Sequence, residues 1–200
     1  MKWQGGVLTR RSGLNFYRKR IHISTDIVKE IANYIFGIVL AVCFAFFIIY
    51  NFGIKTTVIG VSMEDTLYNG QSVLINRLSY LLLQPKRGDV IVFLPNGNQN
   101  THYYIKRVAA VPGDTVQFID GYLYVNGEVV QSDQYDKVSD PGIAESVLTL
   151  KDDEYFVLGD NRNNSEDSRS GNIGPVEKKL IVGRAWFHFG YKDHMFGMIK

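Results

Sequence analysis

The sequence predicts a mainly β domain of antiparallel sheets that lies outside the cytoplasm, behind one N-terminal transmembrane helix. Three observations predict this architecture: an uncharged apolar stretch over residues 31–54, a basic arm before it, and short β-rich runs with turn signals after it. The chain has 200 residues, enough for one span and one compact domain but not for two full-sized globular domains. We therefore divide it into residues 1–30, 31–54 and 55–200.

Residues 1–30 form the basic arm. They carry seven Lys and Arg residues against Asp26 and Glu30, a net charge of +5, although the formal charge of the whole chain is only +2. Basic arms also bind nucleic acid, but the chain has no zinc-ligand spacing, helix-turn-helix pattern or aromatic RNA-binding motif. We expect no nucleic-acid partner. We expect the arm to stay in the cytoplasm, because basic flanks resist translocation.

Residues 31–54 read IANYIFGIVLAVCFAFFIIYNFGI and contain no Asp, Glu, Lys or Arg. This length is sufficient to cross the hydrocarbon core of a bilayer as a helix. A cleaved signal peptide would have a shorter apolar core at the very N-terminus, so we expect a permanent, single-pass anchor in the cell membrane with an extracellular domain. Cys43, the single cysteine, lies in mid-span; it can form no intramolecular disulfide, and we expect it to face lipid.

Short apolar runs alternate with turn signals after Lys55. The runs QSVLINRL, VIVFL, HYYIKRVAAV and TVQFI are separated by PKRGD, PNGN and PGD. The dipeptides Asp120-Gly121 and Asn126-Gly127 favour tight hairpins and predict a three-stranded meander from about residue 115 to 130. EYFVLGD and LIVGRAWFHF predict two later strands around a polar loop, and no long amphipathic helix is expected in the domain.

Ser62 and Lys106 are the candidate nucleophile and base. Ser62 lies in the segment GVSMEDTL, which by itself is an ordinary polar turn before a strand. Lys106 lies in a strand between Tyr104 and Val108 at period two, where poor solvation would lower its pKa toward the range of a base. The alternative is that its side chain reaches water from a sheet edge. Arg107 stays charged and cannot act as a base.

A densely polar segment, residues 159–169, follows the strand EYFVL. It suits either a solvated surface loop or a rigid, internally hydrogen-bonded loop that lines a site. Metal ligands are not indicated, because His22, His102, His188 and His194 are scattered without cysteine partners. We expect neither a metal nor a cofactor.

Together these segments resemble the motifs of the bacterial type I signal peptidases, membrane-bound serine proteases that remove signal peptides from exported proteins. Ser-Met followed by Thr-Leu within 62–67 resembles the nucleophile motif, and RGDVIVF at 87–93 resembles a structural motif. Lys-Arg-Val at 106–108 with Pro-Gly-Asp at 112–114 resembles the motif of the lysine base. The segment 159–169 resembles the last motif, and the single N-terminal span is similar to the Gram-positive subtype.

The resemblance implies a Ser/Lys mechanism in which Ser62 attacks the scissile carbonyl and neutral Lys106 takes its proton. The backbone N–H of Ser62 would be one oxyanion donor. Ser165 would orient the lysine by a hydrogen bond. The other supporting roles are an ion pair of Asp160 with Arg107, and a brace within the last loop from Asp167 and Arg169.

Two positions depart from the family pattern. Members usually have proline where this chain has Asp65, so the turn after the nucleophile must be held another way, for instance by a hydrogen bond between the Asp65 side chain and the backbone. Some members carry a serine as second oxyanion donor where this chain has Gly60. That donor has no assignment from the sequence.

The resemblance implies that the partners are the lipid bilayer and the signal peptides of exported preproteins. One alternative is a catalytically impaired relative that acts as a chaperone in surface-fibre assembly, and retention of Ser62, Lys106 and Ser165 argues against it. Another is a self-cleaving repressor-type Ser/Lys protease, but such proteins carry a DNA-binding domain instead of a span. The apolar run 78–83 is either core or a patch that dips into the membrane interface.

Overall fold

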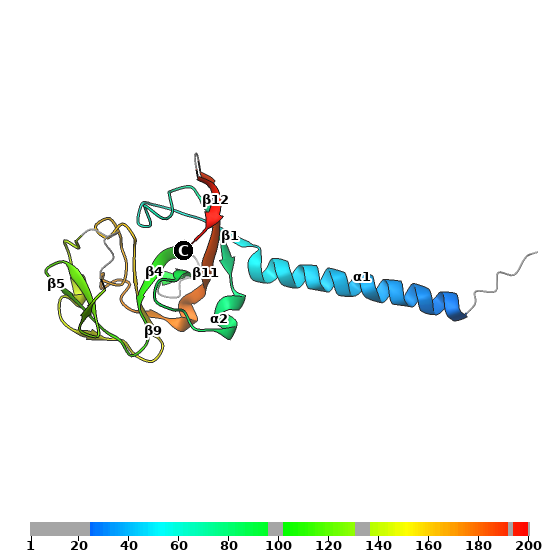
Figure 1. Ribbon diagram of the computed structural model, residues 1–200, viewed down its shortest axis with the longest axis horizontal. Helices are drawn as coiled ribbons and strands as arrows, with labels where there is room; N and C mark the ends of the chain where they lie inside the picture. Colours follow the sequence, from blue (N-terminus) through cyan, green and yellow to red (C-terminus); the bar gives the residue numbers. More distant parts are fainter. Residues whose placement is uncertain (1–24, 96–101, 131–136, 192–193, 200) are drawn as a thin grey trace, which may run out of the picture. The chain divides into compact units, whose positions relative to one another are not determined.

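The computed structural model describes residues 25–95, 102–130, 137–191 and 194–199 (Figure 1). Most of the predicted basic arm, with His22, lies outside the described residues, as does most of the PNGN turn. The chain forms two compact units, residues 1–43 and residues 44–200.

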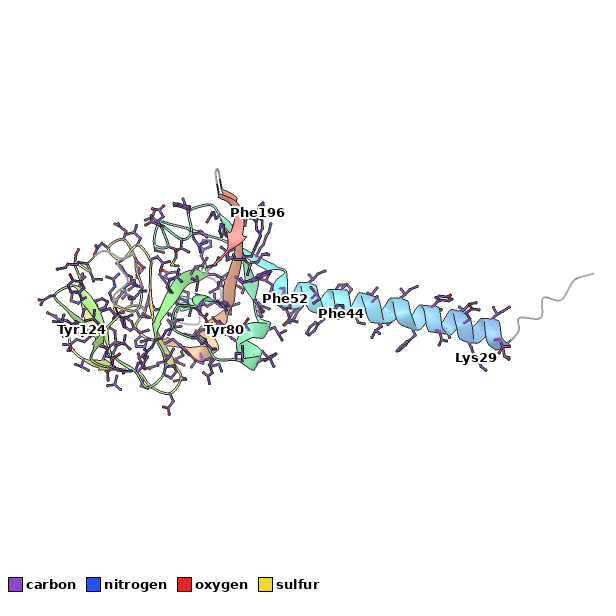
Figure 2. All side chains as sticks on the ribbon, viewed as in Figure 1. Lys29, Phe44, Phe52, Tyr80, Tyr124 and Phe196 are labelled. Carbon is purple, nitrogen blue, oxygen red and sulfur yellow. The ribbon has the colours of Figure 1, made fainter. Side chains whose placement is uncertain are left out.

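Helix α1, Thr25–Phe52, contains most of the predicted span. It is the one helix in the described part of the chain that is long and apolar enough to cross a membrane, and a stretch of 18 residues within it has a mean hydropathy of 2.5. Side chains project from it along its whole length (Figure 2), and Phe36, Phe44 and Phe46 are each more than 60% exposed. A helix that is apolar all round suits a lipid environment. The predicted N-terminal apolar helix is confirmed, with Cys43 exposed on it.

The helix ends earlier than the predicted span, and a strand begins at once. The N–H of Gly53 donates to the carbonyl of Ile49 and closes the last helical turn. Strand β1, Ile54–Thr57, then pairs in antiparallel fashion with β2, Ser72–Asn76. Residues 55–57, which directly follow the predicted span, are therefore part of the sheet.

The larger sheet has eight strands in the order β1-β2-β11-β3-β4-β9-β10, with β12 paired to β11. All its neighbouring strands are antiparallel. Its further strands are β3 Val90–Phe93, β4 Tyr104–Ala110, β9 Glu154–Leu158, β10 Val176–Glu177, β11 Ile181–Tyr191 and β12 His194–Met198.

The smaller sheet contains the predicted meander. Its order is β7-β6-β5-β8, built from β5 Thr115–Ile119, β6 Tyr122–Val125, β7 Glu128–Val129 and β8 Leu148–Thr149. Asp120 and Asn126 have positive φ, 52° and 56°, and each is followed by a glycine with positive φ. These are the tight hairpin turns that the two dipeptides predict. Figure 2 shows Tyr124 of β6 on this sheet.

Helices in the described part of the domain are short: α2 Leu78–Leu82, η2 Gly142–Ala144 and η3 Lys178–Leu180. The mainly β, antiparallel fold is confirmed. The predicted strand QSVLINRL is wrong at its end, because the strand stops at Asn76 and the leucines that follow form α2.

The core covers both faces of the larger sheet. Val90 and Val92 of β3 face one cluster, whereas Ile91 and Phe93 face another. A third cluster joins Phe156 and Leu158 of β9 to the smaller sheet. Strand β4 is an interior strand, because β3 and β9 pair with its two edges. Its residues Ile105 and Val108, which flank Lys106 and Arg107, belong to two different core clusters and hold this part of β4 in place.

Candidate active site

Ser62 lies on a turn between β1 and β2. The N–H of Val58 donates to the carbonyl of Gln71 at 2.8 Å and continues the strand pairing into the turn. Met63 and Leu67 are fully buried in the core beside Val58. The two apolar residues of the Ser-Met and Thr-Leu pairs thus anchor the turn and leave the Ser62 hydroxyl at the surface of the core.

Lys106 lies in β4 with its ammonium directed at this turn. Its Nζ donates to Oγ of Ser62 at 2.6 Å, and only 5% of the residue is exposed. The ammonium also lies 5.6 Å from the centroid of the Tyr104 ring. The alternative in which Lys106 reaches water from a sheet edge is therefore wrong, since β3 and β9 cover β4 on both sides.

Burial lowers the pKa of Lys106 from 10.5 to about 8. The carboxylates of Asp167 and Glu166 act in the opposite direction and raise it. The result agrees with the expectation that poor solvation disfavours the ammonium. Roughly a tenth of the lysine is neutral at pH 7 with such a pKa, so a free-base form is available without a metal or a second base.

Arg107, beside the lysine, forms the ion pair with Asp160 that the resemblance implies. Its Nε and Nη2 donate to the two carboxylate oxygens at 2.8 and 2.7 Å, and the Asp160 side chain is almost fully buried. Arg107 Nη1 also donates to the carbonyl of Gly88, which ties the RGD turn to β4. Bidentate charged hydrogen bonds of this kind fix geometry as well as charge.

Thr66 joins the turn that carries Ser62 to this ion pair, and the sequence did not indicate this contact. Its Oγ1 donates to Oδ2 of Asp160 at 2.6 Å. Asp65, in contrast, is exposed, and the described residues include no hydrogen-bond partner for its side chain. The expectation that Asp65 bonds the backbone is wrong, because the turn is held by the Thr66 hydroxyl and by the buried side chains around it.

The segment 159–169 is a rigid, internally bonded loop rather than a solvated one. Asp167 is 1% exposed and accepts hydrogen bonds from the Gly159 N–H at 3.0 Å and from Arg169 Nε at 2.9 Å. Arg169 also donates to the carbonyls of Asp140 and Arg162. The expected brace of Asp167 with Arg169 is present.

Ser165 does not make the hydrogen bond to Lys106 that the resemblance implies. Its Oγ is buried and has no hydrogen-bond partner among the described residues. The hydroxyl instead packs against Gly159, where an added Cβ would lie 2.3 Å from Ser165 Oγ and 2.4 Å from the Ser62 carbonyl oxygen. In this geometry Ser165 helps the loop pack closely against the turn that carries Ser62. It does not bond to Lys106.

The backbone conformation of Gly60 disfavours a serine two residues before Ser62. Its φ is +89°, a backbone conformation that side-chain-bearing residues rarely adopt. Its N–H donates to Oδ1 of Asn69 at 3.1 Å. Position 60 therefore offers no hydroxyl to an oxyanion, and the second donor has to come from elsewhere.

A cleft of about 470 Å³ opens beside Ser62 and Lys106. Two chain segments, 58–63 and 102–106, form most of its wall, and most of the side chains there are apolar. Among the described residues, no three His, Cys, Asp or Glu side chains converge as metal ligands. The lining residues are Val58, Ile59, Gly60, Val61, Ser62, Met63, His102, Tyr103, Tyr104, Ile105, Lys106, Asn164 and Glu166.

Comparison with known proteins places these features in one family. A family described as "Signal peptidase, peptidase S26" matches residues 31–190. Signal peptidase I of Bacillus licheniformis is 31% identical over 83% of this chain and 92% of its own length, and signal peptidase I S of Bacillus subtilis is 35% identical over 80% and 90%. Probable signal peptidase I-2 of Synechocystis sp. is 39% identical over 64% of this chain, which spans 59% of that longer relative.

Proposed function

Because the chain belongs to the signal peptidase family, peptidase S26, whose members are serine endopeptidases, we propose that it removes N-terminal signal peptides from exported preproteins. Ser62 is the nucleophile and Lys106 the base in this proposal. Helix α1 anchors the enzyme in the cell membrane, with residues 1–30 in the cytoplasm and the domain outside. Ser165, Asp160, Arg107, Asp167 and Arg169 support the site.

The observation that carries the proposal is the contact of Lys106 with Ser62. A buried lysine 2.6 Å from a serine hydroxyl, with its pKa lowered to about 8, has both the geometry and the proton affinity of a general base. No other described lysine contacts a serine hydroxyl in this structure. The pair also faces the cleft, where a peptide can reach it.

The reaction follows from these positions. Neutral Lys106 takes the proton of Ser62 as Oγ bonds to the scissile carbonyl carbon, and the backbone N–H of Ser62 donates to the oxyanion that forms. The C–N bond then breaks, and the amine leaves with the proton from the Lys106 ammonium. Water, deprotonated by the lysine, attacks the Ser62 ester, the bond between the acyl carbon and Ser62 Oγ breaks, and the Lys106 ammonium returns the proton to Oγ. The signal peptide leaves with a free carboxylate.

The cleft suits an extended, apolar stretch of polypeptide. One wall is the segment 58–63, which bends at Gly60 and enters the turn at Ser62, and the other is the segment 102–106, which runs into β4. A peptide in the cleft can pair with the backbone groups of the second segment. Ser62 follows the end of α1 by one short strand and a turn. A membrane-embedded signal peptide emerging near α1 would therefore present its cleavage site close to this cleft.

The chaperone alternative is not favoured. A binding module has no need for a lysine that is buried at a cost in solvation, and here that lysine contacts the serine that it would activate. Relatives with the signal peptidase name also cover most of the chain.

Cleavage of a preprotein by purified full-length variants tests the proposal. Ser62→Ala should reduce the rate on the order of 10³-fold or more, because the attacking oxygen is gone. Lys106→Arg keeps a cation that cannot give up its proton, and it should be comparably inactive. Unchanged circular dichroism of both variants would show that they fold. Near wild-type cleavage by either variant would exclude the dyad.

A further inference from the structure

One acidic side chain lines the cleft. Glu166 is the single Asp or Glu among the described residues that form its wall, and most of the other side chains there are apolar. The Tyr104 hydroxyl donates to Oε2 of Glu166 at 3.4 Å and holds the carboxylate beside β4. The carboxylate also raises the pKa of Lys106, so its negative charge acts on the catalytic pair.

The loop 159–169 presents Glu166 to the cleft. Both chain neighbours face the interior of the domain, since Ser165 Oγ is buried and Asp167, 1% exposed, is bonded to Arg169. Glu166 between them is exposed. In the part of the chain that the structure describes, no lysine, arginine or histidine forms an ion pair with its carboxylate. A charge held on a rigid loop in this way is available to a bound substrate.

A substrate side chain that reaches this carboxylate would be a lysine or an arginine. The carboxylate attracts a cation and repels a second acidic group. The aliphatic stems of lysine and arginine also suit the apolar walls, while their charged ends reach the carboxylate. The signal-peptide side of the scissile bond offers no such residue, because an apolar segment and small residues precede the cleavage site. The cation therefore comes from the mature protein, just after the scissile bond.

We propose that Glu166 is a specificity-determining residue that pairs with a lysine or arginine among the first few residues of the mature protein. This inference deepens the signal-peptide cleavage proposed above and rests on it. Preproteins with such a residue would be cleaved faster than those with a neutral or acidic residue at the same position. Because Glu166 is exposed to solvent, the preference should be moderate and should weaken in high salt.

Preproteins that differ at one position test the pairing. They carry lysine, alanine or glutamate at the first, second or third residue after the scissile bond. At the position that reaches Glu166, the wild-type full-length enzyme should cleave the lysine substrate with a kcat/KM on the order of fivefold above that of the glutamate substrate. The alanine substrate should lie between them. The preference should approach unity at about 1 M salt, where the screening length is roughly 3 Å.

Two variants assign the preference to Glu166. Glu166→Gln should abolish it, and Glu166→Lys should invert it in favour of the glutamate substrate. The preference is a ratio between substrates on one enzyme, so a change in the pKa of Lys106 affects both substrates alike and cancels. Glu128→Gln is the matched control, because Glu128 is also exposed but lies in β7 of the smaller sheet and does not line the cleft. This control should keep the wild-type ratio.

Equal kcat/KM values for the lysine and glutamate substrates at all scanned positions would overturn the inference and leave signal-peptide cleavage intact. A lysine preference that survives in Glu166→Gln would overturn it as well, since another group would then select the cation. Failure of the wild-type enzyme to cleave any of these preproteins would refute the proposed function, and this inference with it.

Discussion

Lys106 is placed where it reduces the stability of the fold. The folded-state pKa of about 8 lies below the ordinary value of 10.5 because the ammonium is buried. At pH values below 8 the lysine is charged in both the folded and unfolded chain, and burial of that charge costs about 3 kcal/mol. The cost falls as pH rises from 8 toward 10.5, since the folded lysine is then neutral. Burial thus makes the neutral form of Lys106 accessible near neutral pH, and it lowers the free energy of unfolding of the domain.

Lys106→Met should accordingly stabilise the protein while it abolishes cleavage. Methionine fills a similar volume without a charge, so the free energy of unfolding at pH 7 should rise by up to about 3 kcal/mol. The gain should shrink toward zero near pH 10. Chemical unfolding of the full chain in detergent at the two pH values measures this difference.

Lys151→Met is the matched control for that experiment. The Lys151 side chain is 78% exposed and pairs with Glu154 at the surface, an arrangement that contributes little to stability. Its replacement should change the free energy of unfolding only slightly at either pH. A Lys106→Met variant that is no more stable than the wild type at pH 7 would show that the buried ammonium is fully compensated by its neighbours.

At the scale of elements, the site is an assembly of one turn, one strand and one loop. The turn carries Ser62, and β4 carries Lys106 and Arg107. Gly159 of the loop 159–169 packs closely against the turn. The Thr66 hydroxyl and the Arg107–Asp160 pair connect all three. The position of Ser62 therefore depends on how closely the loop can approach the turn.

Gly159→Ala tests that dependence. An added Cβ would lie 2.4 Å from the Ser62 carbonyl oxygen, so the loop and the turn must move apart. A displacement of about 1 Å can reduce a rate on the order of 10²-fold, and we expect such a loss in kcat for peptide cleavage.

Gly171→Ala supplies the control for the loop. An added Cβ there meets nothing within 4 Å, and φ of Gly171 lies outside the positive range that residues with side chains rarely adopt. This variant should keep the wild-type kcat. Equal activity of the two variants would show that the loop does not set the position of the nucleophile.

Local patterns in the sequence predicted individual residues and turns, and the family resemblance supplied two distant pairs, Ser62 with Lys106 and Asp160 with Arg107. Distant contacts that neither source indicates were missed. Period-two alternation placed Lys106 among apolar neighbours, and the two turn dipeptides located the meander. The Thr66 contact with Asp160 joins residues 94 positions apart, and no local pattern indicates such a contact. The two-residue strands β8 and β10 are too short to show a period, and no glycine or proline separates β2 from the leucines of α2.

At the scale of the whole molecule, access of exported preproteins to the cleft depends on the orientation of the chain in the membrane. The basic arm of net charge +5 predicts that the N-terminus stays in the cytoplasm. Protease added to intact cells should then digest the region after residue 55 and spare residues 1–30. Protection of the domain and digestion of the arm would invert the orientation and place the cleft on the wrong side for exported substrates.

Neutral Lys106 activates Ser62 in the proposed reaction, and the pH dependence of kcat/KM reports directly on the protonation state of that lysine. A protonated lysine cannot accept the serine proton, so the rate constant should rise about tenfold per pH unit in the acidic range and level off above the lysine pKa of about 8. Glu166→Gln should move this rise to lower pH, because the Glu166 carboxylate raises the pKa of Lys106. A rate constant for preprotein cleavage that does not change between about pH 6 and pH 9 would contradict this role of Lys106.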